Sequence, residues 1–157
     1  MCGPQVTDRP RGGALAALSP PTGSSPRARK RHLQGDLAFH QPGHPASCKA
    51  THARLTPAEH HGLGDVHSVR VVIHSTGDLT KDAADCGFYR QFTFPAASSS
   101  DSYFEIPLET PLSLEVGSNG IIGRRVSISA AECEAGSEGV LAEGIVGFNF
   151  LDQRPSL

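Results

Sequence analysis

VHSVRVVIHS, residues 66–75, is the stretch that decides the fold class. β-branched residues dominate it, and apolar and polar residues alternate well enough for a half-buried strand. The residues that follow, from Ser75 to Asp78, favour a turn. The sequence therefore predicts a strand over residues 66–74. A strand needs partners, and the sequence after it supplies them.

The next strand is predicted from FYRQFTF, residues 88–94. Strand side chains alternate between two faces, so Phe88, Arg90, Phe92 and Phe94 share one face. Pro95 ends this strand, because proline has no N–H to donate to a ladder. Three aromatic rings on one face indicate a side that is buried against a core.

YFEIPLETPLSLEV, residues 103–116, continues the pattern with two prolines, which favour edge or bent strands. Residues 117–120 (GSNG) are predicted to form a tight hairpin, because an Asn-Gly step favours positive φ. Two more strands are expected over residues 124–133 and 140–152. About six strands without a helix-length pattern predict a mainly β fold, a small antiparallel β-sandwich or barrel.

Residues 1–62 differ in composition from the rest of the chain. They hold eight basic and three acidic residues, a net charge of +5, whereas residues 63–157 hold six basic and 13 acidic residues, a net charge of −7. Eight of the 12 prolines also lie before residue 63. We therefore expect residues 1–62 to form a largely disordered basic tail, and residues 63–157 to form an acidic antiparallel β domain.

A short helix is expected at residues 56–61 of this tail. Thr56 can serve as its N-cap, Pro57 suits the first helical position, and Glu59 closes a capping box.

EHHGLGDVH, residues 59–67, is the segment that most resembles a metal site. Asp65 and His67 are two residues apart and would share one face of an extended segment. His60 and His61 project about 100° apart on a helix, so only one of them could join a tetrahedral ion. A site for zinc or another divalent metal is one hypothesis. The alternative is a polar hinge with solvent-exposed histidines and no cofactor, which the sequence favours.

The basic cluster PRARKRH, residues 26–32, predicts a polyanion contact through Arg27, Arg29, Lys30 and Arg31. Nucleic acid, an anionic membrane, an acidic protein surface or an import receptor would each fit this charge. A solvated tail without a partner is the alternative. No aromatic residue lies within the cluster, which argues against base stacking.

Catalytic patterns are weak. No serine lies in a GxSxG nucleophile elbow. Cys86 and Cys133 are expected to be small buried side chains, or a disulfide if their Cα atoms come within about 7 Å. The sequence leaves open whether the protein is an enzyme and favours a non-enzyme. Without a signal peptide or a transmembrane segment, an intracellular location, cytoplasmic or nuclear, is the default expectation.

Two segments resemble a known family. VRVVIHSTGDLTKDAAD (69–85) and DSYFEIPLETPLSLEVGSNG (101–120) resemble the opening and middle strands of PLAT domains, β-sandwich modules found beside lipases and lipoxygenases. The resemblance implies a non-catalytic role in binding lipid or a protein partner. The chain has no Trp, which such domains usually carry near their last strands, and GIVGFNFLD (144–152) departs from their pattern. We therefore do not assign the chain to this family.

Three functional hypotheses follow. The leading one is a non-enzymatic binding module that engages a protein or lipid partner through a sheet face or an edge strand, with a basic tail that adds electrostatic reach. The second is a metal-binding protein or metal-dependent enzyme that uses the cluster at residues 60–67. The third is a basic-armed nucleic-acid-binding or coat-like protein.

Overall fold

The computed structural model describes residues 12–21, 33–58, 68–81, 83–95, 103–130 and 140–149. These ranges contain nine strands and one short 3-10 turn, and no helix in them is long and apolar enough to cross a membrane. The strands are β1 (Ala14–Leu18), β2 (Gly35–His40), β3 (Lys49–Pro57), β4 (Val69–Ile73), β5 (Arg90–Phe94), β6 (Phe104–Val116), β7 (Gly120–Ile122), β8 (Arg125–Ala130) and β9 (Val140–Phe148); the turn, η2, spans Ala83–Cys86.

All nine strands belong to one sheet, in the order β5-β4-β8-β9-β1-β2-β3-β6-β7. Every neighbouring pair is antiparallel except β6 and β7, which run parallel. β1 lies at the centre and pairs with β2 on one side and β9 on the other. The first strand of the chain therefore joins the two halves of the sheet.

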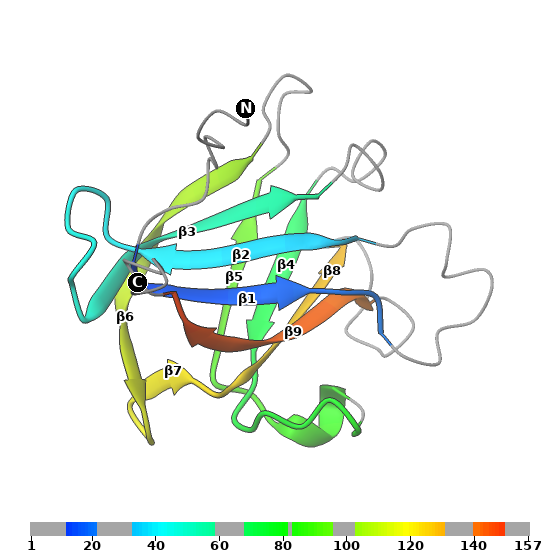
Figure 1. The fold of residues 1–157 in the computed structure, drawn as a ribbon. Helices are drawn as coiled ribbons and strands as arrows, with labels where there is room; N and C mark the ends of the chain where they lie inside the picture. The colour runs from blue at the N-terminus through cyan, green and yellow to red at the C-terminus, as the bar shows by residue number, and fades with distance from the viewer. Residues whose placement is uncertain are drawn as a thin grey trace, which may run out of the picture.

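The sheet folds over on itself, so that β1, β2 and β3 lie in front of β4, β5 and β8 (Figure 1). The space between these layers is filled by one apolar core to which all nine strands contribute. Its largest fully buried side chains include Phe39, Phe94, Leu37, Leu55 and Ile73. Burial of apolar surface at about 25 cal/mol per Å² is the main stabilising contribution of such a core.

The predicted mainly β class is confirmed, but its finer description is not. The sheet has nine strands instead of about six, contains one parallel pair, and is an open sheet that ends at β5 and β7. Strands expected after residue 65 are found as β4, β5, β6, β8 and β9. The additional strands are β7 and the three that come before residue 62.

The prediction that residues 1–62 are a disordered tail is wrong for the described part of that segment. β1, β2 and β3 lie within it, and Ala14, Ala16, Phe39 and Leu55 are fully buried. β1 pairs with β9 and β3 pairs with β6, so the described residues on both sides of position 62 share one sheet. Composition predicted disorder because short strands built from alanine and single large side chains contain few of the residues with high β propensity.

The short helix predicted at residues 56–61 is also wrong at its start. Thr56 and Pro57 are the last two residues of β3 and pair with Asp36 and Gly35 of β2. Residues 59–61 lie outside the described ranges. Proline is tolerated at this position because it ends the strand.

β6 is bent, as its prolines predict: its register with β3 shifts between the pairs Ala50–Leu112 and His52–Pro107.

The tight hairpin predicted at residues 117–120 is wrong. A turn is present, but positive φ falls on Gly117 (126°) and not on Asn119, and β7 then runs parallel to β6. Because β7 runs parallel to β6, the strands on either side of this turn do not form an antiparallel hairpin.

The position of Phe39 leads to a test of this fold. Its ring is fully buried and packs edge-to-face on Phe92 of β5, with centroids 6.1 Å apart. Phe39→Ala should lower the free energy of unfolding by about 3–5 kcal/mol, the usual cost of an emptied aromatic site in a core. Phe88→Ala is the matched control, because Phe88 is 62% exposed, and should change stability by no more than about 0.5 kcal/mol. Urea unfolding measures both. Equal, small effects would mean that β2 is not part of the core.

Candidate functional site

The site residues predicted from the sequence lie outside the described ranges. This holds for the metal candidates His60, His61, Asp65 and His67, and for the polyanion candidates Arg27, Arg29, Lys30 and Arg31. Both hypotheses therefore stay predictions. In the described ranges, no group of three or more His, Cys, Asp or Glu side chains could hold a metal ion.

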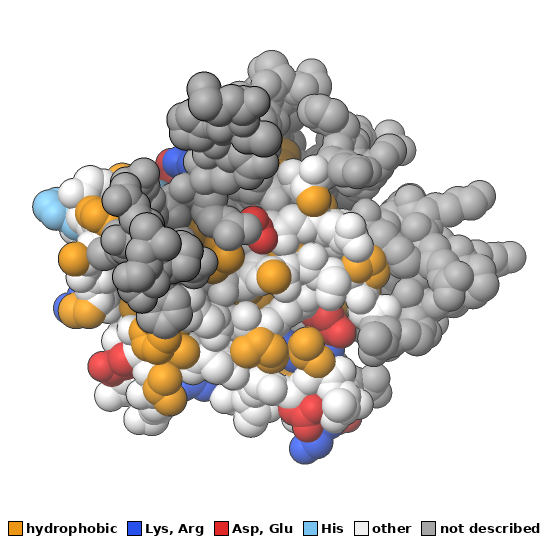
Figure 2. Space-filling view, in the orientation of Figure 1, with side chains coloured by type: hydrophobic (Ala, Val, Ile, Leu, Met, Phe, Trp, Pro, Cys, Tyr) orange, Lys and Arg blue, Asp and Glu red, His pale blue; other side chains and the backbone are white. Residues whose placement is uncertain are grey.

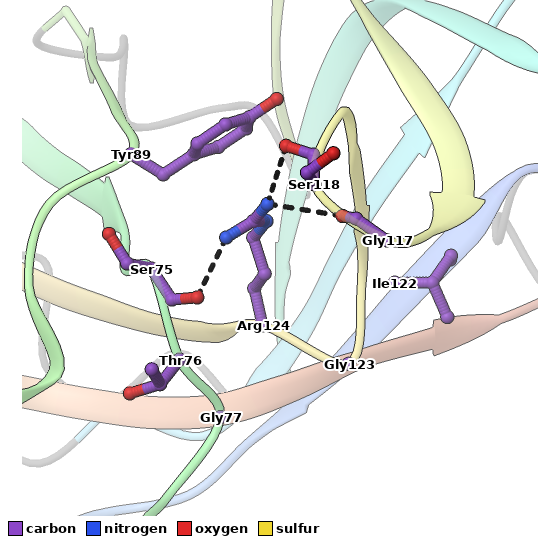
Figure 3. Close-up of a pocket in the computed structure, with 9 residues that line it drawn as sticks. All are labelled: Ser75, Thr76, Gly77, Tyr89, Gly117, Ser118, Ile122, Gly123 and Arg124. Atoms are coloured by element: carbon purple, nitrogen blue, oxygen red, sulfur yellow. Dashed lines mark hydrogen bonds between the residues drawn. The ribbon is translucent and has the colours of Figure 1, made fainter.

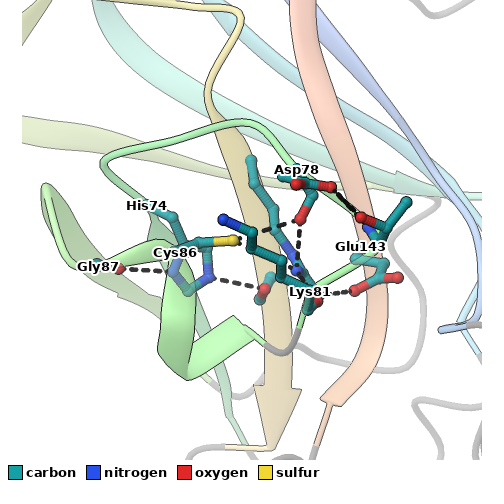
Figure 4. A network of polar contacts seen from close by, with 9 residues as sticks. His74, Asp78, Lys81, Cys86, Gly87 and Glu143 are labelled. Atoms are coloured by element: carbon teal, nitrogen blue, oxygen red, sulfur yellow. Dashed lines mark hydrogen bonds and ion pairs between the residues drawn. The ribbon is translucent and has the colours of Figure 1, made fainter.

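A buried polar network lies where the segment after β4 covers the outer face of β8 and β9 (Figure 4). Arg125 of β8 forms a buried ion pair with Glu143 of β9. Its Nη1 also donates to the main-chain oxygens of Asp78, at 3.0 Å, and Lys81, at 2.6 Å. Cys86, 1% exposed, is a free thiol that donates to the Asp78 carbonyl. One guanidinium thus holds the covering segment to the sheet.

The expectation that Cys86 is a small buried side chain is therefore confirmed. Cys133, its suggested disulfide partner, lies outside the described ranges.

His74 completes the network and has a defined tautomer. Its Nδ1 lies 2.8 Å from the carbonyl oxygen of Gly87, which can only accept, so Nδ1 carries the proton. Its Nε2 therefore accepts a hydrogen bond from Ser127 Oγ at 2.8 Å. Burial is the largest effect and lowers the pKa of His74 below its usual value. The hydrogen bond to Gly87 opposes it, the Arg125 charge lowers this pKa further, and Glu143 raises it least. The imidazole is neutral near pH 7.

Ser127 and His74 have the composition of a nucleophile and its base, but they are placed for a structural role. Each residue is only 5% exposed. The imidazole is oriented by a main-chain carbonyl and not by a carboxylate. A substrate would have to reach Ser127 Oγ through the covering segment, whereas catalysis requires an accessible hydroxyl beside donors for the developing oxyanion. The pair fixes the loop after β4.

A second arrangement joins β2, β3 and β6 on the outer face of the sheet. Glu105 Oε1 accepts from His40 Nε2 at 2.6 Å and from Arg54 Nε at 3.1 Å. Burial raises the pKa of Glu105, but the bonds from His40 and Arg54 outweigh it and hold that pKa below its ordinary value. Burial lowers the pKa of His40 despite its bond to Glu105. A neutral imidazole and a carboxylate in this geometry form a cross-strand link.

An open pocket of about 540 Å³ lies beside Arg124 (Figure 3). It is lined by Tyr89 and by residues 75–77, 117–118 and 122–124. Arg124 spans it: its Nε donates to the Gly120 carbonyl at 2.6 Å, its Nη1 to that of Ser75 at 2.7 Å, and its Nη2 to those of Gly117 and Ser118. Its guanidinium carbon lies 3.9 Å from the centroid of the Tyr89 ring. The arginine holds two turns together.

The sheet is left open between β5 and β6. Within the described ranges β5 pairs only with β4, and β6 pairs with β7 only at Ser113 and Val116. One edge of β5 and one edge of residues 104–110 therefore have no strand partner in the part of the chain that the structure describes. Partly exposed side chains from both strands pack against the core here: Phe92, Phe104, Ile106 and Leu108.

Other hydrophobic side chains are scattered over the described surface. Phe88, Tyr103, Val116 and Phe148 are the exposed large ones. In the view of Figure 2, some hydrophobic side chains lie across the lower part of the face, near β7 and β9, and others lie at its left edge and centre.

Comparison with known proteins adds no family. No protein-family model matches the chain, and no curated protein matches it. The likeness to PLAT domains therefore stays a resemblance, and function has to be argued from the geometry above.

Sequence reasoning missed the groups that the fold brings together. His74, Ser127, Arg125 and Glu143 come from three strands or strand ends and share no motif spacing. The pocket was missed for a related reason, since it forms where two turns meet. The sequence did predict both turns, at residues 75–78 and 117–120. These two turn predictions are the signal that could have indicated the pocket.

The buried neutral state of His74 predicts a pH dependence. Because its folded pKa is lowered from 6.5, the unfolded chain binds more protons as the pH falls below that value, and the folded state loses stability. His74→Gln, which can keep both hydrogen bonds, should reduce the loss of unfolding free energy between about pH 7 and pH 5. His44→Gln is the matched control, since His44 is exposed in the turn after β2. Urea unfolding at a series of pH values measures the slopes. If the unfolding free energy of the two variants fell equally with pH, His74 would not be a neutral, buried imidazole.

Proposed function

We propose that this protein is a non-enzymatic binding module that pairs an extended segment of a partner protein with the free edge of β5. The observation that carries this proposal is the opening between β5 and β6. Partly exposed aromatic and aliphatic side chains line it, and the bordering main chain has no strand partner among the described residues.

An extended polypeptide is the partner class that fits such an edge. Main-chain N–H and C=O groups of a strand edge are satisfied best by another main chain, which adds to the sheet as a further strand. A small molecule or a lipid surface cannot supply that ladder. The edge therefore favours a protein segment as the partner.

The side chains of β5 define what the partner segment would present. Phe92 and Phe94 point toward the core, while Gln91 and Thr93 are exposed on the other face. A paired segment would place apolar residues beside the phenylalanines and polar residues beside Gln91 and Thr93. Arg90 and Pro95 flank this edge, and a charged residue and a proline both limit how far pairing extends.

The alternatives draw less support from the described residues. The hydrogen-bonded Ser127–His74 pair is buried, so it does not support hydrolysis. The metal hypothesis at residues 60–67 and the nucleic-acid hypothesis at residues 27–31 rest on residues outside the described ranges, and both stay predictions.

Selection from a display library of random peptides on the immobilised protein tests the proposal. Peptides with alternating apolar and polar residues should be enriched. Thr93→Lys places a charge on the edge strand and should weaken their binding at least about tenfold.

Ala17→Lys is the matched control for this experiment. It adds the same charge at an exposed position of β1, a strand with neighbours on both sides, and should leave peptide binding unchanged. Failure to enrich any such peptide, or equal binding by both variants, would contradict the proposal.

A further inference from the structure

The pocket beside Arg124 carries positive charge and no acidic side chain. None of its lining residues is Asp or Glu. Among the described residues Arg124 makes no ion pair; its contacts are with four main-chain carbonyls and the face of Tyr89. Carbonyl dipoles offset part of a guanidinium charge but do not neutralise it. The pocket is therefore a place where an anion would be stabilised.

Hydrogen-bond donors remain available there. An arginine side chain has five N–H groups. The four hydrogen bonds of Arg124 leave one N–H of Nη1 without a partner among the described residues. The main chain is also unobstructed, since a Cβ added at Gly117 or Gly123 would meet no atom within 4 Å. A small group can therefore approach both the guanidinium and the backbone.

A second arginine reinforces the charge. The guanidinium carbon of Arg90 lies 4.8 Å from the centroid of the Tyr89 ring, and that of Arg124 lies 3.9 Å from it. Two like charges on one ring are closer than the Debye length of about 10 Å at 0.1 M salt, so they repel each other. Arg90 is exposed, and within the described ranges it donates to the Tyr89 carbonyl. A bound anion would relieve this repulsion.

We propose that this pocket binds the oxyanion group, phosphate or carboxylate, of a small ligand. Arg124 supplies a fixed charge and one donor, and exposed Arg90 supplies a second charge with several donors. Guanidinium groups pair with both kinds of oxyanion in the same geometry. This site is separate from the β5 edge and goes beyond the proposed binding of a partner segment.

Nuclear magnetic resonance titration tests the proposal. Sodium phosphate, sodium acetate and sodium chloride are added separately to the labelled protein at constant ionic strength. The signals followed are the Nε–H of Arg124 and the amides of residues 117–119. Saturating shifts with phosphate alone assign the site to phosphate groups, and saturating shifts with acetate assign it to carboxylates.

Arg90→Gln and Lys49→Gln form a matched pair of variants. Each removes one exposed positive charge, but Arg90 contacts the ring of Tyr89, which lines the pocket. Arg90→Gln should weaken oxyanion binding about fivefold, which is what one charge pair at about 4 Å contributes in bulk water. Lys49→Gln should bind as the unaltered protein does. Shifts that stay linear with both oxyanions and match those with chloride, or equal affinity in the two variants, would overturn the proposal.

Discussion

The pairing of β1 with both β2 and β9 is the constraint on which the rest of the structure depends. Without it the sheet separates into β2-β3-β6-β7 and β5-β4-β8-β9, and the core between them opens. β1 can occupy this place because Ala14 and Ala16 are small and fully buried. Gly144 of β9 is required for the same approach, since a Cβ there would lie 2.4 Å from the Ala17 oxygen.

Folding of the sheet about β1 also determines where the polar side chains lie. Arg124 and Arg125 are adjacent in sequence, yet one clamps the exposed turns of the pocket and the other is buried against Glu143. Both also hold the segment after β4, through the carbonyls of Ser75 and Asp78. The loop that forms one wall of the pocket is therefore fixed from two sides. A buried ion pair of this kind costs desolvation energy and serves mainly to fix one arrangement.

Much of the C-terminal half could be predicted from the sequence, because its strands are rich in valine, isoleucine and phenylalanine and their pattern survives without tertiary information. β1 could not, since ALAAL has low β propensity and reaches burial only through its neighbours. The prolines and arginines near it in the sequence indicated disorder, although they precede or follow β1 and β2 in the chain and do not lie within them. The candidate sites were harder still, because Tyr89, Ser118 and Arg124 meet only after folding.

Amide hydrogen exchange of β1 tests the central claim most directly. If β1 joins the two halves of the sheet, the amides of Ala14–Leu18 that bond to β2 and β9 exchange only through global unfolding, so their protection free energy equals that of β8. Exchange of β1 at the rate of an open loop, with β4 and β8 still protected, would contradict the account and make the N-terminal strands an appendage of a smaller domain.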